Sequence, residues 1–214
     1  MNAGQSEIGG NQLPTFAELT PDNIVAFLAD IFARRGAEEY LGEPVTMAEH
    51  MLQAAQCAQD AGQSPAVIVA ALLHDIGHFT SEFGTYSPAD VVDKHHEDAG
   101  AAVLAPFFPP QVTDCVRFHV AAKRYLCATR PEYFQKLSPA SVHTLMLQGG
   151  PMGSDEAAAF ERNAHWRDVI KVRVYDDTGK RSGVPTKTFV DYMPMVQQVV
   201  DAHRQERAQA ELGA

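Results

Sequence analysis

The chain has 214 residues, of which 45% are hydrophobic and 21% are charged, so its length and composition fit one globular domain. The formal net charge of −10, with no basic block to offset it, argues against nucleic acid as a partner. Cys57, Cys115 and Cys127 form no CxxC pair, which favours reduced cysteines in a cytoplasmic protein. The first residues show no signal-peptide pattern, and the longest apolar run, residues 66–73, is too short to cross a bilayer.

Helical periodicity predicts a single all-α domain over residues 14–208, between flexible tails at 1–13 and 209–214. Helices are expected at 20–35, 46–62, 64–78, 91–107, 111–128, 138–147, 154–170 and 188–208. A loop is expected at 79–90, and residues 171–175 could be a short strand or the end of a helix. Thr46 and Glu49 have the spacing of a capping box, and Gly77 is expected to end its helix.

A histidine and an aspartate stand together at the end of an apolar run, in LLHDIGH at residues 72–78. An aspartate there would be costly to bury without a cation or several hydrogen-bond donors. A metal ion meets that need, because imidazole and carboxylate are common ligands, although an Asp–His hydrogen bond that orients one side chain is an alternative. On the preceding helix, His50 shares a face with small residues and is expected to point inward.

Two later helical patterns each contain one inward histidine. In KHHEDAGAAVL, His96 lies on the stripe of small and apolar residues, whereas His95 falls off it and is expected at the surface. In RFHVAAKRYL, His119 and Lys123 are four residues apart and share a face. Beside a metal-bound anion this lysine would be an oxyanion partner; the alternative is a solvated lysine on an amphipathic helix.

The late segment IKVRVYDDTGK adds a carboxylate. Asp176 could be the last ligand and Asp177 a turn residue, although the sequence separates the two poorly. The inward candidates are then His50, His74, Asp75, His96, His119 and Asp176. Four imidazoles and two carboxylates are too many for one ion that keeps a position open, and they suit two ions bridged by a carboxylate such as Asp75. Ligand type alone leaves iron, manganese and zinc open.

Several segments together resemble one branch of the HD-domain superfamily, the mixed-valent di-iron oxygenases that cleave the C–P bond of 1-hydroxy-2-aminoethylphosphonates, including N-trimethylated substrates. These segments are YLGE before His50, LLHDIGH, His96–Glu97, HVAAKRYL, QGGPM and KVRVYDD. The likeness runs from about residue 24 to residue 200. The HD pair alone is weak evidence, but HVAAKRYL and QGGPM are not general features of HD phosphohydrolases and make the branch fairly specific.

The resemblance implies a compact HD-domain helical bundle around two iron ions, Fe(II) and Fe(III), with O2 as co-substrate and a small organophosphonate as substrate. The six inward residues would be iron ligands, with Asp75 bridging. Phosphonate contacts are implied for His78, Lys123, Ser141 and Arg173, with Gln148 as a weaker candidate near the substrate. Tyr40 and Glu43 would form a gate at one iron.

The products implied are inorganic phosphate and either glycine or glycine betaine. A primary ammonium would favour a carboxylate such as Glu43, whereas a trimethylammonium would favour aromatic rings. Candidate rings are Tyr40, Phe79, Phe83 and Tyr86. The main alternative function is an HD phosphohydrolase that uses two divalent metals on a small phosphate ester, and a non-catalytic sensing module is a third. The sequence leaves stereochemistry and a homo-oligomeric state open.

Overall fold

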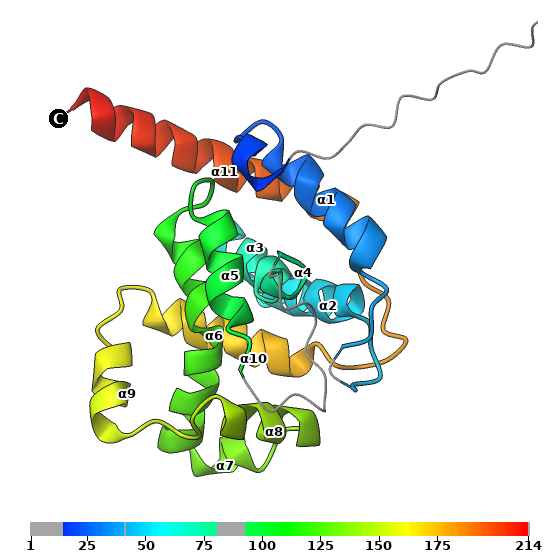
Figure 1. Cartoon of the computed structure of the whole chain (residues 1–214), viewed down its shortest axis with the longest axis vertical. Helices are drawn as coiled ribbons and strands as arrows, with labels where there is room; N and C mark the ends of the chain where they lie inside the picture. Colours follow the sequence, from blue (N-terminus) through cyan, green and yellow to red (C-terminus); the bar gives the residue numbers. More distant parts are fainter. Residues whose placement is uncertain (1–14, 41, 81–92, 214) are drawn as a thin grey trace, which may run out of the picture.

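The computed structural model describes residues 15–40, 42–80 and 93–213, and this part of the chain is built from helices joined by short connections (Figure 1). The elements are η1 (Phe16–Glu18), α1 (Ile24–Arg35), α2 (Met47–Asp60), α3 (Pro65–Leu73), α4 (Gly77–Thr80), α5 (His96–Leu104), α6 (Pro110–Thr129), α7 (Pro131–Phe134), α8 (Pro139–Leu147), α9 (Ser154–Phe160), α10 (Trp166–Thr178) and α11 (Phe189–Leu212). The described ranges hold no strand, only one isolated bridge between Glu39 and Thr46. The all-α prediction is therefore confirmed.

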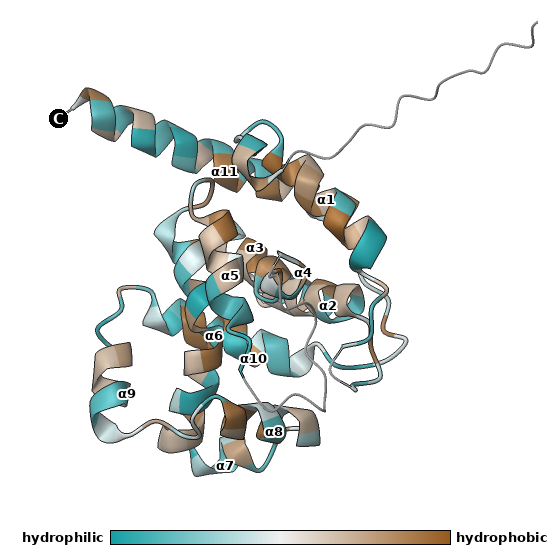
Figure 2. Ribbon diagram, viewed as in Figure 1, coloured by the Kyte–Doolittle hydropathy of each residue, from teal (hydrophilic) through white to brown (hydrophobic). Residues whose placement is uncertain are grey.

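Helix α3 forms the centre of the core. Its residues from Val67 to Leu73 are all buried, and it packs against α2, α6, α10 and α11. Figure 2 shows strongly apolar colouring on α3, whereas the outer end of α11 is largely hydrophilic. Ser64 begins α3 by accepting a hydrogen bond from the Val67 amide, and Thr46 and Glu49 form the expected capping box on α2. These caps fix where α2 and α3, which pack against each other, begin.

Gly77 does not end its helix as expected. Helix α3 stops at Leu73, residues 74–76 form a turn, and Gly77 begins the short α4. A Cβ on Gly77 would lie 1.8 Å from the carbonyl oxygen of His96, so only glycine lets α4 approach the start of α5 this closely. The turn and this close contact place the three polar residues of the LLHDIGH segment at the centre of the domain.

Other boundaries also differ from the prediction. The single helix expected at 154–170 is two helices, α9 and α10, and residues 171–175 continue α10 rather than forming a strand. Helix α5 begins only at His96, and α11 runs to Leu212, into the range expected to be a tail. The expected tail at 1–13 and most of the loop at 79–90 lie outside the described residues. Within those residues, no helix has the length and apolar character needed to cross a bilayer.

Candidate metal site and substrate cavity

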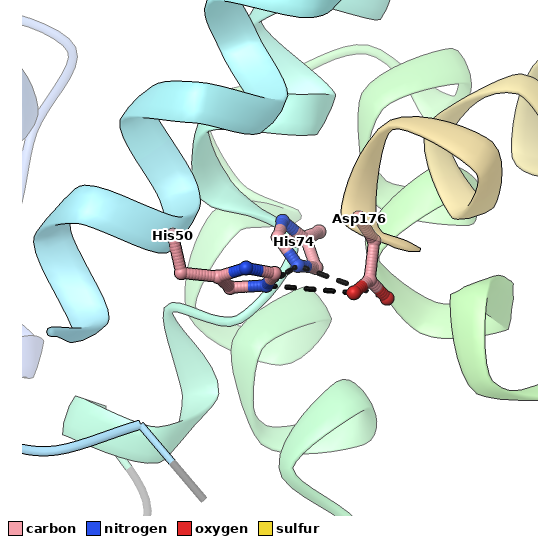
Figure 3. A group of neighbouring side chains, drawn as sticks. All are labelled: His50, His74 and Asp176. Atoms are coloured by element: carbon pink, nitrogen blue, oxygen red, sulfur yellow. Dashed lines mark hydrogen bonds and ion pairs between the residues drawn. The ribbon is translucent and has the colours of Figure 1, made fainter. Parts of the chain in front are cut away.

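One cluster of possible ligands joins three elements (Figure 3). His50 comes from α2, His74 from the end of α3 and Asp176 from α10, and all three side chains are buried. The two Nε2 atoms lie 3.0 Å apart. Asp176 places Oδ1 at 3.5 Å from Nε2 of His50 and Oδ2 at 3.9 Å from Nε2 of His74. Two imidazoles and a carboxylate therefore converge on one point.

A second cluster lies beside the first. It consists of Asp75 from the turn after α3, His96 from the start of α5 and His119 from α6. The Nε2 atoms of the two histidines are 3.2 Å apart, and Oδ1 of Asp75 lies 3.2 Å and 3.3 Å from them. All three residues are buried. The six residues predicted to be ligands thus form two groups of three.

Asp75 connects the two clusters. Its Oδ1 faces the second cluster, whereas its Oδ2 lies 3.4 Å from Nε2 of both His50 and His74. Burial opposes ionisation of this carboxyl, but the surrounding imidazoles of His74, His119 and His50 together outweigh burial and hold the Asp75 pKa well below its usual range. A carboxylate with one oxygen toward each group has the geometry of a bridging ligand.

Backbone carbonyls orient three of the four imidazoles. Nδ1 lies 2.9 Å from the Gly179 carbonyl in His50, 2.8 Å from the Ala71 carbonyl in His74 and 2.7 Å from the Val116 carbonyl in His119. A carbonyl only accepts, so each Nδ1 carries a proton, and each Nε2 offers a lone pair to a metal ion when its ring is neutral. Lone pairs aimed at one another are unfavourable unless a cation lies between them.

The chemistry of this donor set fits metal ions. Oδ2 of Asp75 and Oδ1 of Asp176 are buried, and neither has a hydrogen-bond partner among the described residues. Buried carboxylate oxygens normally have such partners or bind a cation. Together with the Nε2 lone pairs of His50 and His119, these oxygens offer the N and O ligands that iron, manganese and zinc accept.

A cavity beside the clusters has a cationic wall, formed by Lys123 of α6, Arg173 of α10 and Lys180 just after α10. Lys123 donates a 2.7 Å hydrogen bond to Oγ1 of Thr144. Burial, and then the charge of Arg173, lowers the Lys123 pKa to about 7. Burial opposes the charge of Arg173, but the carboxylates of Asp176 and Asp177 outweigh it and raise the Arg173 pKa. The wall combines three cationic groups in an acidic protein.

His78 and Tyr40 stack on the imidazoles. The His78 ring lies parallel to His96, with centroids 4.0 Å apart, and its Nε2 is 4.0 Å from Oδ1 of Asp75. Burial, followed by the charge of His96, lowers the His78 pKa well below its usual value. The Tyr40 ring stacks on His50 at 3.9 Å, and burial, reinforced by the nearby Asp75 carboxylate, raises the Tyr40 pKa. Both residues line the cavity.

The structure brings the predicted site residues together. The cavity is lined by Tyr40, Glu43, Asp75, His78, His96, His119, Lys123, Ser141, Gln148, Arg173 and Asp176, and His50 and His74 complete the cluster behind it. Asp177 instead contacts Arg173 and Tyr133, and these contacts distinguish its position from that of Asp176. Glu43 accepts a 2.5 Å hydrogen bond from Ser138. His95 is exposed, as expected.

Sequence reasoning missed Lys180 and Thr144, which also line the cavity. Residues three or four apart on a helix share a face, but this spacing argument does not extend to Lys180, which lies beyond the end of α10 at Thr178. The same spacing argument could have identified Thr144, which follows Ser141 by three residues in α8.

The helical fold and the central HD pair define an HD-domain protein, and residues 47–136 match the HD domain family. The chain is 59% identical over 190 residues to [1-hydroxy-2-(trimethylamino)ethyl]phosphonate dioxygenase (glycine-betaine-forming) of Leisingera caerulea, covering 89% of this chain and 97% of that protein. It is 38% identical over 183 residues to hydroxymethylphosphonate dioxygenase of Gimesia maris, covering 85% and 90%. The chain therefore belongs to the HD-domain family of phosphonate dioxygenases, as the sequence resemblance indicated.

Proposed function

We propose that this protein is a di-iron oxygenase that cleaves the C–P bond of [1-hydroxy-2-(trimethylamino)ethyl]phosphonate with O2. In the balanced reaction, the substrate, with a doubly deprotonated phosphonate and a trimethylammonium, reacts with O2 to give glycine betaine, hydrogen phosphate and a proton. The C–P and C1–H bonds break, and C1 is oxidised to the carboxylate. The observation that carries the proposal is the pair of His/Asp clusters joined by Asp75 beside a cationic wall, in a chain 59% identical to an enzyme named for this reaction.

The six clustered residues would hold two iron ions, His50, His74 and Asp176 on one side and His96 and His119 on the other, with Asp75 between them. Iron bound there would supply the redox chemistry that O2 requires and a Lewis acid for the substrate oxygens. Burial of all six side chains keeps bulk water from these positions.

The cavity residues would bind and orient the phosphonate. An arginine offers paired N–H donors to such an anion, and a lysine offers a point charge, which are the roles proposed for Arg173 and Lys123. His78 and Ser141 line the same cavity and add neutral donors. Gln148 also lines it, and its buried Oε1 has no hydrogen-bond partner within the described ranges. Together these groups would present C1 to the metal side of the cavity.

At the nitrogen end of the substrate, Tyr40 and Glu43 line the cavity together and offer an aromatic ring and a carboxylate to a quaternary ammonium. Phe79 is less suited, because its ring packs against Phe32 and lies under the guanidinium of Arg35 at 5.0 Å. The other two candidate rings, at positions 83 and 86, lie outside the described residues. The trimethylated substrate is favoured because the relative that shares 59% identity is named for it.

The test is an aerobic assay of iron-loaded protein that records phosphate release and O2 consumption together. The panel contains the trimethylated 1-hydroxyphosphonate, its primary-amine analogue, hydroxymethylphosphonate and a simple phosphate monoester. We expect one O2 consumed for each phosphate released, with the highest kcat/KM for the trimethylated substrate. Phosphate release from the ester without O2 uptake would instead establish the phosphohydrolase, and no turnover would favour a sensing module.

A further inference from the structure

Lys180 is a third cationic group of the cavity, placed directly after the end of α10. Its side chain is 12% exposed. The ammonium donates a 2.9 Å hydrogen bond to Oγ of Ser141, lies 3.9 Å from Oδ1 of Asp176 and sits 5.7 Å from the centroid of the Tyr40 ring. A long, flexible cation is therefore held between the ligand cluster and the position expected to bind phosphonate.

Arg173 is less available than Lys180 to neutralise an incoming anion. Its Nη1 lies 2.6 Å from Oδ2 of Asp176, its Nη2 contacts Oδ1 of Asp177, and its Nε donates to the Tyr133 hydroxyl at 3.0 Å. Two carboxylates share this one guanidinium, so its positive charge is already offset inside the protein. Arg173 thus holds Asp176 in place as well as lining the cavity.

Lys180 and Lys123 have a different environment. Each ammonium makes its hydrogen bond to a neutral hydroxyl, Ser141 for Lys180 and Thr144 for Lys123. The 3.9 Å from Lys180 to the Asp176 carboxylate exceeds hydrogen-bond length. An ammonium has three donors, so Lys180 keeps N–H groups beyond the one used by Ser141. The Ser141 hydroxyl orients the ammonium, and the charge of the ammonium is not neutralised by a close ion pair with Asp176.

We propose that Lys180 binds the phosphonate directly and supplies, with Lys123, the two positive charges that a phosphonate dianion requires. This inference rests on the proposed function for the identity of the anion. Because the Lys180 ammonium can only donate, it also occupies a lone pair of Ser141 and directs the serine hydroxyl proton away from itself. Lys180 and Ser141 then act as one anion-binding unit within the cationic wall.

The experiment compares Lys180→Gln, which keeps a donor for Ser141 without the charge, with wild type. Lys187→Met is the control, because Lys187 is an exposed lysine bonded to Gln59. Iron-loaded proteins are titrated without O2, first with the trimethylated phosphonate and then with inorganic phosphate. Losing a charged donor to the anion should raise both Kd values roughly 10- to 100-fold, with iron content unchanged. Lys180→Arg should recover most of the affinity, and Lys187→Met should match wild type.

Two results would overturn the proposal. One is a Kd for Lys180→Gln within about twofold of wild type. The other is loss of iron from this variant, which would mean that Lys180 supports Asp176 rather than the substrate. Failure of the proposed function looks different, because wild type would then show no O2-coupled phosphate release. The titration with inorganic phosphate would still decide whether Lys180 binds an anion.

Discussion

The two halves of the cavity are held in place in different ways. In the ligand cluster, the imidazoles of His50, His74 and His119 are each fixed by a backbone carbonyl, and none of the six cluster residues is more than 7% exposed. In the cationic wall, Lys123 and Lys180 are oriented by single serine or threonine hydroxyls. The protein backbone thus determines where metal would bind, whereas adjustable side-chain contacts determine how an anion is held.

Removing the bridge should have the largest effect. In Asp75→Asn, one oxygen becomes an amide nitrogen that cannot ligate as an anion, so both metal positions lose their shared ligand. We expect iron content to fall below one per chain and activity to fall on the order of 1,000-fold. Metal analysis and the O2-coupled phosphate assay measure both. Asp60→Asn, an exposed substitution at the end of α2, should keep full iron content.

Removing a ligand from one cluster should be more selective. His119→Ala takes an imidazole from the second cluster and leaves His50, His74 and Asp176 untouched. We expect iron to drop from about two toward one per chain and activity to fall on the order of 100-fold. His143→Ala, at an exposed position of α8, serves as the control. Equal loss of both ions would show that the two clusters do not bind metal separately.

The charge of the cationic wall should affect the pH dependence of kcat/KM. Burial lowers the Lys123 pKa to about 7, so the side chain is charged below that pH and neutral above it. Binding of a dianion needs the charged form, so kcat/KM should fall roughly tenfold per unit as pH rises above about 7. Lys123→Arg should move this alkaline limb to higher pH, since a guanidinium stays protonated. An identical alkaline limb in wild type and Lys123→Arg would show that protonation of Lys123 does not control binding of the anion.

Removing the hydroxyl of Tyr40, the residue proposed to act as a gate at the iron, should have the smallest effect. Tyr40→Phe keeps the ring that stacks on His50 at 3.9 Å and removes only the hydroxyl. If that hydroxyl shields the iron before substrate arrives, the variant should oxidise its iron in air a few times faster without substrate, which absorbance or Mössbauer spectra would follow. An unchanged oxidation rate would leave Tyr40 as a packing residue.

Part of the cluster could be predicted because His50, His96 and His119 lie on helices with clear periodicity. His74 and Asp75 were instead predicted from the cost of burying an aspartate at the end of an apolar run. His96 was distinguished from His95 by the stripe of small residues on its face, and the structure buries the first and exposes the second. The metal-binding role of the cluster remains a prediction. The helical pattern predicts which face of its helix each side chain occupies, and in this molecule the inward faces of the helices meet.

The sequence could not predict features set by contacts distant along the chain. The break between α9 and α10 coincides with hydrogen bonds from Asn163 and His165 to Asp114 on α6, which no local pattern shows. Gly77 was interpreted as a helix end, although its role is the close approach to His96. Lys180 lies beyond the end of α10, where periodicity no longer indicates a direction. Each of these depends on tertiary packing rather than on the local sequence.

The most direct test of the account is diffraction from crystals of iron-loaded protein, with anomalous data collected on both sides of the iron absorption edge. We expect two iron peaks about 4 Å apart or less, one beside His50, His74 and Asp176 and the other beside His96 and His119, with Asp75 between them. A single peak, or iron bound away from these six side chains, would contradict the central claim.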